Sequence, residues 1–397
     1  MDITWKDVQN SLGIKDTAIE FLSFLNEDNT TIYAALVLTR KTPSPVFITL
    51  GEESLFTKEL QDASNSFLLY DRIWGQLKDH ICPGGNIYFS PTGKLYQLNI
   101  EVLPDSVGCR AYEQYSLHRV SSTRNLCEKR HINRFSRAIL FGDLNYDMGI
   151  AEMHTVSLAY HDDSILNLRG SHVTGDKKWE SLPETRIEIE SINELCASNG
   201  IECTLIESDA GVEESFKSIS GNDYSIVHVA THGFFKPDDS STNSYLNRVK
   251  NPEDYYSNSE MNNSGLIFSG ANHAWTENLV PDDTDDGVLL ASEISTIDLS
   301  KVDIVVLSAC DTGLGLLSTE GVMGLQYGFK QAGVQTVLMS LWKIDDAATR
   351  EFMIEFYRNL LSGESKQEAL NKTRDHMRNS TKYSNPYYWA PFIMLDD

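Results

Sequence analysis

The chain has 397 residues, of which 41% are hydrophobic, and it carries a formal net charge of −24 at pH 7. This length allows a full hydrophobic core, and the negative charge argues against direct binding to nucleic acid or to an anionic membrane. No apolar run reaches the roughly 20 residues of a membrane-spanning helix. The six cysteines form no CxxC pair, and no secretory leader follows Met1. We therefore expect a cytoplasmic protein with free thiols and no membrane contact.

Two parts of the chain differ in their hydrophobic pattern. Over residues 1–130 we expect a smaller α/β unit, with strands at 31–39, 45–50 and 86–90 and a helix at 71–81. Over 131–397, apolar runs alternate with helical periods, which predicts a mostly parallel central sheet with helices on both faces. The predicted strands cover 137–141, 202–206, 225–230, 303–308, 335–340 and 391–395. The predicted helices cover 184–197, 319–332, 347–361 and 365–377.

Two of these strands end at reactive side chains. His232 follows the strand 225–230, and Cys310 follows the strand 303–308. Functional groups of open α/β sheets lie at the carboxyl ends of the strands. A thiol has a pKa of about 8.5 and needs a neighbouring imidazole to become a nucleophile at neutral pH. The pattern predicts a cysteine protease with His232 and Cys310 as its catalytic pair and the backbone N–H groups of Gly233 and Cys310 as oxyanion donors.

The chain resembles the CHAT domains, which are caspase-like peptidases similar in their core to separase. Seven tracts carry this resemblance in the order that the family has them, at residues 228–235, 264–272, 286–294, 306–315, 320–324, 340–342 and 389–392. The tracts 182–185 and 88–95 extend it toward the N-terminus. The resemblance implies a caspase-like three-layer fold in which His232 and Cys310 form a catalytic dyad. It treats 1–130 as a pseudo-protease-like part of the same domain. No 34-residue tetratricopeptide period is found.

An acidic insertion of about residues 236–300 separates the two strand ends. Its second half carries family tracts and is expected to form a hairpin. Residues 236–263 are expected to form a mobile loop that gates the site. The run Asp282–Gly287 with Glu293 imitates a calcium-binding loop, although Thr284 stands where such loops usually have a carboxylate, and this alternative remains open.

Two other histidine and carboxylate patterns have competing interpretations. His228 and His232 have the spacing of a helical zinc site, but on a strand they would be roughly 13 Å apart, so we expect His228 to be a core residue and no metal to be bound. Asp345 and Asp346 begin a helix, where either could be an N-cap. By resemblance to separase, Asp346 implies a pocket for a basic residue before the scissile bond. The same tract supplies the expected substrate contacts Asp345, Ser340 and Trp342.

The predicted function is a cytosolic cysteine endopeptidase that needs no cofactor and cleaves specific protein substrates. The resemblance implies a bacterial defence or cell-death pathway, with a gasdermin or another defence effector as substrate and a repeat-containing or sensor protein as partner. Two alternatives are a non-catalytic CHAT scaffold and an acyl transferase that uses the same dyad.

Overall fold

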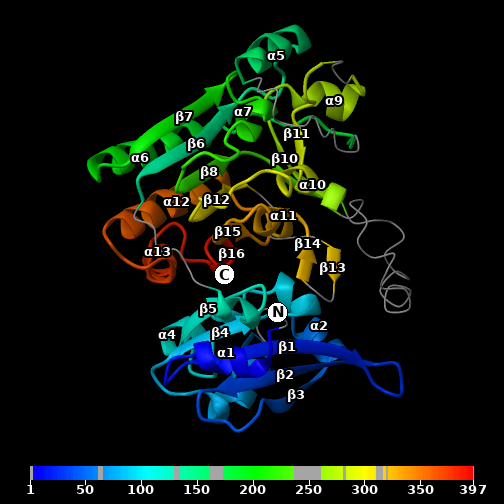
Figure 1. Ribbon diagram of the computed structural model, residues 1–397, viewed down its shortest axis with the longest axis vertical. Coiled ribbons are helices and arrows are strands. Elements are labelled where there is room, and N and C mark those ends of the chain that lie inside the picture. The colour runs from blue at the N-terminus through cyan, green and yellow to red at the C-terminus, as the bar shows by residue number, and fades with distance from the viewer. Residues whose placement is uncertain are drawn as a thin grey trace. The chain divides into compact units, whose positions relative to one another are not determined.

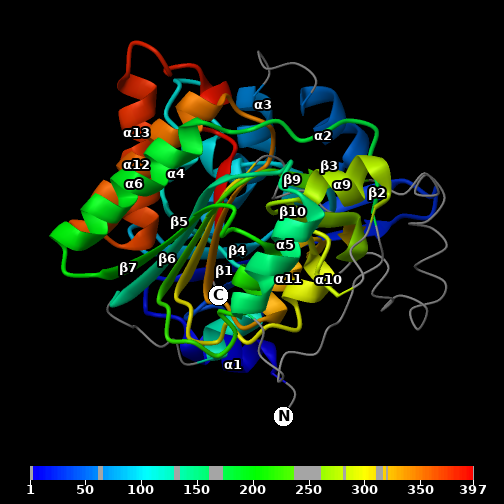
Figure 2. The same ribbon diagram turned by 90° about the horizontal axis from the view of Figure 1, so that it is seen from above.

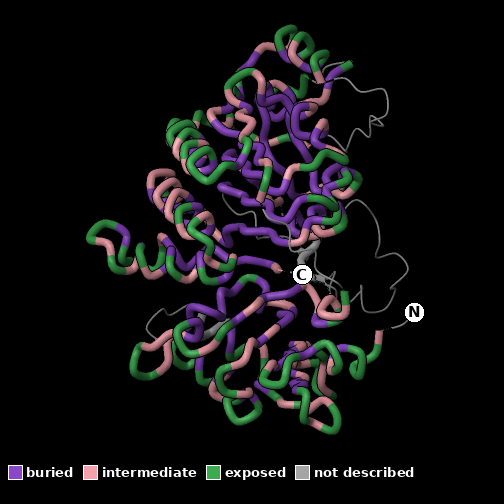
Figure 3. Tube along the Cα trace, turned by 60° about the vertical axis from the view of Figure 1, so that its left-hand side comes forward, coloured by how far each residue is buried: buried purple, intermediate pink, exposed green. Residues whose placement is uncertain are grey.

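The computed structural model describes residues 3–60, 66–128, 135–160, 173–236, 261–279, 283–309, 316–318 and 321–396. Two compact units make up the chain. Met1–His131, Thr319–Gly321 and Met394–Asp397 form the first, and Ile132–Ser318 with Val322–Ile393 form the second. Figure 1 labels the elements of each unit, and Figure 3 shows buried residues inside each unit and exposed residues on the outer turns of the helices.

The first unit is a small α/β structure. Its strands run in the order β3, β2, β1, β4, β5, with β1 antiparallel to β2 and parallel to β4. The bounds of these strands are β1 Thr17–Leu25, β2 Thr31–Thr39, β3 Val46–Glu52, β4 Asn86–Ser90 and β5 Ser116–Arg119. The helices are α1 Trp5–Ser11, α2 Glu53–Leu60, α3 Ser66–Tyr70 and α4 Ala111–Gln114. The helix expected at 71–81 is present but irregular: it is π-helical over Asp71–Gly75 and becomes a 3-10 helix over Lys78–His80.

The second unit is built on a parallel sheet. Its strands run in the order β15, β12, β8, β6, β7, and every pairing described between them is parallel. The strands are β6 Arg137–Leu144, β7 Glu202–Ser208, β8 Ile226–Ala230, β12 Ile304–Ser308 and β15 Thr336–Ser340. β8 and β12 are buried over their whole length, as expected of central strands covered on both faces.

Helices cover both faces of this parallel sheet. Figure 2 shows α6, α12 and α13 on one face and α5, α10 and α11 on the other. The helices of this unit are α5 Ile150–Ser157, α6 Glu184–Ser198, α7 Glu213–Lys217, α9 Ala271–Glu277, α10 Ala291–Ile294, α11 Leu325–Gln331, α12 Asp346–Leu361 and α13 Lys366–Asn379. The mixed α/β fold predicted from the sequence, with a mostly parallel sheet covered by helices on both faces, is confirmed.

Two strands of the insertion join β9, which directly precedes the insertion, in a second, antiparallel sheet, here called the inserted sheet, in the order β11, β10, β9. Its strands are β9 Gly233–Phe235, β10 Ser264–Ile267 and β11 Val288–Leu290. The gating loop expected at 236–263 lies outside the described residues except for Lys236 and the 3-10 turn Met261–Asn263.

The remaining strands include one departure from expectation. They are β13 Leu316–Ser318, β14 Gly321–Met323 and β16 Phe392–Asp396. The predicted helix start at residue 319 was wrong. Residues Gly321–Met323 form the strand β14, and α11 begins only after its N-cap, Gly324. Two glycines and the β-branched Val322 disfavour a helix there.

Candidate functional site

His232 lies between two strands of different sheets. It follows β8 after Thr231, and β9 begins at the next residue, Gly233. Thr231 fixes this crossing point: its N–H donates to the carbonyl of Ser308 at the end of β12 (3.3 Å), and its hydroxyl donates to the carbonyl of Ile267. The end of β8, the end of β12 and the inserted sheet therefore meet at His232.

The imidazole of His232 has a defined partner on one nitrogen. Nε2 lies 2.7 Å from the backbone carbonyl oxygen of Glu180. A carbonyl oxygen only accepts hydrogen bonds, so Nε2 must carry the proton. In the neutral ring Nδ1 is then the basic nitrogen, able to accept a proton from a nearby acid.

Two aromatic rings pack against this imidazole, with the ring centroids of Tyr146 and Trp179 each 5.0 Å from that of His232. Burial lowers the pKa of His232, and the charge of Lys343 lowers it further, while the Glu180 carbonyl acts in the opposite direction. The net effect favours the neutral, proton-accepting form of the ring near pH 7.

The register of the inserted sheet sets the direction of the Gly233 N–H. The Ile267 N–H donates to the His232 carbonyl (3.0 Å), so these opposed residues form a hydrogen-bonded pair. The next pair, Gly233 and Leu266, is then of the non-hydrogen-bonded kind, whose backbone N–H groups point away from each other. The Gly233 N–H therefore points away from β10, as an oxyanion donor would require.

Cys310 lies outside the described residues, as do the five residues after it. The chain is described up to Ala309, whose carbonyl accepts a hydrogen bond from the hydroxyl of Ser340 at 2.8 Å. Ser340 is buried at the end of β15. The expected substrate residue Ser340 thus holds the backbone that leads into Cys310. Whether Cys310 and His232 come together remains a prediction.

The segment 173–183, here called the strap, brings Trp179 and Glu180 to His232 and leads into α6. Sequence reasoning missed both residues, and also Tyr146 and Asn272. A backbone carbonyl acceptor such as that of Glu180 leaves no signature in residue type. Asn272 is the last residue of the family tract 264–272, and this position in the tract is the one sequence signal that could have pointed to it.

The two aspartates at the start of α12 differ in position and in environment. Asp345 is the N-cap, and its carboxylate accepts from the Ala348 N–H at 3.2 Å. Asp346 is the first helical residue, and its carboxyl is partly buried. Burial, together with the negative charges of Glu188 and Glu184, raises the pKa of Asp346 to about 6. The expected contact residue Trp342 donates from Nε1 to the carbonyl of Tyr387 at 3.1 Å.

His228 is a fully buried core residue, as predicted from its place inside a strand. Its Nε2 lies 2.9 Å from a carboxylate oxygen of Glu188, and its Nδ1 lies 3.3 Å from the hydroxyl of Tyr357. Both ring nitrogens therefore face groups of the helices α6 and α12, which cover this face of the sheet.

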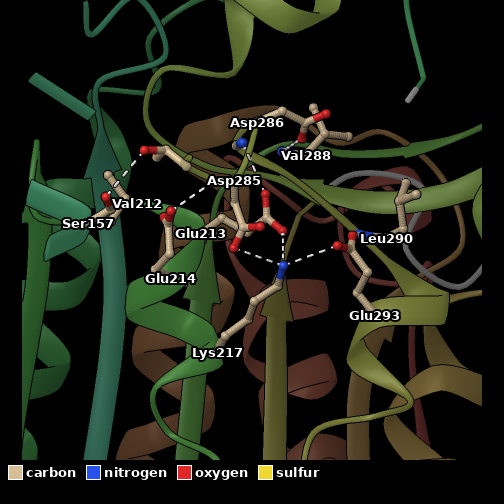
Figure 4. Close-up of polar contacts among 12 residues, drawn as sticks. Ser157, Val212, Glu213, Glu214, Lys217, Asp285, Asp286, Val288, Leu290 and Glu293 are labelled. Atoms are coloured by element: carbon tan, nitrogen blue, oxygen red, sulfur yellow. Dashed lines mark hydrogen bonds and ion pairs between the residues drawn. The ribbon is translucent and has the colours of Figure 1, made fainter. Parts of the chain in front are cut away.

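A buried cluster of carboxylates lies beside the inserted sheet (Figure 4). The ammonium of Lys217 contacts oxygens of Glu213 (2.7 Å), Asp285 (2.9 Å) and Glu293 (3.1 Å). These are the only three acidic, histidine or cysteine side chains of the described residues that are close enough together to share a metal ion. Asp285 and Glu293 belong to the segment that resembles a calcium-binding loop in the sequence. The Lys217 ammonium lies between these carboxylates, where a calcium ion would be expected under that interpretation.

The charges of this cluster shift one another's pKa values in definite directions. Burial raises the pKa of Glu213 well above its usual range, and it also raises that of Glu293. Burial lowers the pKa of Lys217, but the carboxylates of Glu213, Glu293 and Asp285 outweigh this and raise it. Backbone N–H groups hold the outer oxygens, from Gly287 to Glu213 at 3.0 Å and from Leu290 to Glu293 at 2.8 Å. The cluster thereby fastens the inserted sheet to α7.

Neither a membrane span nor a disulfide is found among the described residues. None of the helices described combines the length and hydropathy needed to cross a bilayer. The five cysteines that the structure describes, Cys82, Cys109, Cys127, Cys196 and Cys203, are all free.

The second unit is thus an α/β structure with a histidine presented where two central parallel strands end. The model of the CHAT domain family matches residues 66–397, and the chain belongs to that family. Among curated proteins it is similar to tetratricopeptide repeat protein 28 of Homo sapiens, with 33% identity over 127 residues. The match covers 29% of this chain and 5% of the human protein. The mouse (Mus musculus) protein is 32% identical over 108 residues, which are 27% of this chain and 4% of that relative.

Two solved structures are also similar to this chain. The Saccharomyces cerevisiae separase–securin complex is 11% identical with a TM-score of 0.43, covering 83% of this chain and 17% of that one. The Arg-specific cysteine proteinase gingipain R is 9% identical with a TM-score of 0.39, covering 85% and 67%.

Proposed function

We propose that this chain is a cysteine endopeptidase in which His232 and Cys310 act as a dyad. One observation carries the proposal: Nε2 of His232 is held by the Glu180 carbonyl at 2.7 Å, at the point where β8 and β12 end together. The ring is thereby fixed in the tautomer whose Nδ1 is basic, and Cys310 is two residues beyond the Ser308 carbonyl that binds Thr231.

In the proposed reaction, Nδ1 of His232 takes the proton of the Cys310 thiol. The thiolate attacks the carbonyl carbon of the substrate peptide bond, and the N–H groups of Gly233 and Cys310 stabilise the oxygen that becomes negative. The imidazolium then protonates the leaving amine, so that the C–N bond breaks and an acyl-enzyme remains. Water, deprotonated by the same ring, hydrolyses the thioester and restores the thiol.

The substrate class that we propose is a protein with a basic residue before the scissile bond. Asp346 is partly buried and is not the cap of its own helix, because Asp345 has that role. A carboxylate in such surroundings pairs strongly with Arg or Lys. A cytoplasmic setting, a defence effector as substrate and a repeat-containing partner complete the proposal.

The decisive experiment replaces each half of the dyad. Cys310→Ala and His232→Ala should each abolish peptide cleavage, and the double variant should lose no more than either alone, because the two residues act as one unit. Cys196→Ala, which removes a buried thiol, is the matched control and should keep its activity. Full cleavage by Cys310→Ala would reject the proposal.

The same variants separate the alternatives. A scaffold would show no cleavage in the parent chain and unchanged partner binding in Cys310→Ala. An acyl transferase would form the same thioester but pass the acyl group to an added amine instead of water, which mass spectrometry of the products detects.

A further inference from the structure

Asn272 contacts the backbone of both aromatic residues that pack on His232, although it does not touch His232 itself. Its own N–H donates to the carbonyl of Tyr146 at 3.0 Å. Its side-chain oxygen accepts from the N–H of Trp179 at 2.8 Å, and its side-chain nitrogen donates to the carbonyl of Trp179 at 3.0 Å. One residue thus connects the two neighbours of the imidazole.

The local chain explains how Asn272 reaches this place. Gly270 begins α9 with φ of +85°, in the left-handed region that favours glycine. A Cβ at Gly270 would also lie 2.0 Å from the sulfur of Met153, so a larger residue there would collide. Asn272 follows in the first turn of α9 and is only 1% exposed. Its amide is aligned further by the carboxylate of Asp147, which accepts from Nδ2 at 3.1 Å.

We propose that Asn272 is a positioning residue for His232. By holding both backbone groups of Trp179, it keeps the next carbonyl, that of Glu180, on Nε2 of the imidazole. The ring then stays in the tautomer with the proton on Nε2, and Nδ1 remains the base. This inference rests on the proposed function for its consequence in catalysis, but the tautomer can be measured independently of any activity.

An amide is the side chain that this place requires. The backbone of Trp179 presents one donor, its N–H, and one acceptor, its carbonyl, and a side-chain amide pairs with both at once. Without it, a backbone N–H and a carbonyl would lose their partners in a partly buried place, which costs free energy and favours movement of the strap.

The strap has other attachments, so loss of Asn272 should act locally. The N–H of Gly175 donates to the carbonyl of Trp275 at 2.8 Å. Lys178 forms ion pairs with Asp147 (3.3 Å) and Glu277 (3.4 Å). The strap should therefore remain on the protein while the Glu180 carbonyl loses its fixed position.

The test measures the imidazole nitrogens of His232 by NMR in the full chain at pH 8, with the signals assigned by their loss in His232→Gln. In the parent we expect the proton on Nε2. In Asn272→Leu, which matches the asparagine in shape but has no polar atoms, we expect a mixture of tautomers. The control is Thr276→Val, which removes a hydrogen bond of the same helix to the Asn272 carbonyl (2.9 Å) and should leave the tautomer unchanged.

Kinetics give a second readout, because Asn272 touches no substrate. We expect kcat of Asn272→Leu to fall roughly 10- to 100-fold while KM changes by less than about twofold. If Asn272→Leu does not fold, Asp147→Ala serves as the second variant, because Asp147 is exposed and its substitution is tolerated more easily. It should also give a mixture of His232 tautomers, with a smaller change from the parent. A parent-like tautomer in whichever variant folds would overturn the inference. If Cys310→Ala still cleaves peptides, the proposed function is rejected. The positioning role of Asn272 is then tested only by the NMR measurement of the His232 tautomer.

Discussion

Replacing Lys217 by Met should destabilise the second unit strongly. The ammonium contacts three buried carboxylates at 2.7–3.1 Å, and the lysine side chain is 11% exposed. Removal of one partner from a buried ion pair costs about 3–5 kcal/mol, because the remaining charges stay in a medium of low polarity. We expect a loss of this size in the free energy of unfolding at pH 8, measured by urea denaturation followed by circular dichroism.

The loss should depend on pH in a definite direction. The folded-state pKa values of Glu213 and Glu293 are raised, so the folded protein binds more protons than the unfolded chain near and above their ordinary titration range. Stability then falls as the pH rises through the folded-state values. Without the ammonium these values rise further, so Lys217→Met should lose less stability at pH 5 than at pH 8.

The matched control is Lys178→Met, which also removes a lysine with two carboxylate partners. Lys178 is exposed, so its ion pairs are screened by solvent and its loss should change stability little. An equal effect of both substitutions, or a stable Lys217→Met protein at pH 8, would refute the view that burial makes this cluster depend on its lysine.

Three further predictions concern the site and the cluster. Calcium should raise the thermal unfolding midpoint of Lys217→Met but not that of the parent, because only the variant leaves three carboxylates without a central cation. Titration calorimetry that finds no calcium binding to the variant would contradict this. With the pKa of Asp346 at about 6, the ratio of kcat/KM for a basic over a neutral peptide should rise about tenfold from pH 5 to pH 7. Asp346→Asn should abolish that rise, and a rise that persists would remove Asp346 from the pocket. Asp345→Ala should cost about 1 kcal/mol of stability through the lost cap while the basic preference remains, and loss of that preference would speak against separate roles.

The hydrophobic pattern was sufficient to predict those helices and strands that bury one regular face in the core. The helix expected at 184–197 is α6, and the helix expected at 365–377 is α13, whose N-cap Ser365 accepts at its hydroxyl from the Glu368 N–H at 3.2 Å. The strand 31–39 was likewise confirmed as β2. The neighbouring β1, Thr17–Leu25, was missed, since it carries Glu20 and Ser23 among its apolar residues.

The candidate site could be anticipated only in its reactive side chains. His232 stood out because an apolar strand ends at it. The Glu180 carbonyl could not be anticipated, because any residue provides a carbonyl and only the path of the strap brings this one to Nε2. The Lys217 cluster joins α7 to two segments that are distant in the sequence. Asp285 and Glu293 belong to the run that resembles a calcium-binding loop, so the sequence suggested a metal ion there. The lysine that contacts them lies about 70 residues earlier, where no local pattern connects it with that run.

The central claim is that the imidazole of His232 activates the thiol of Cys310, and the rate of alkylation of each cysteine tests it most directly. The protein is treated with a limiting amount of iodoacetamide near pH 7, and the six cysteines are followed separately by peptide mass spectrometry. Cys310 is expected to react fastest in the parent, and His232→Ala should slow it to the rate of an ordinary exposed thiol. A Cys310 that reacts no faster than Cys82, or whose rate is the same in the parent and in His232→Ala, would contradict it.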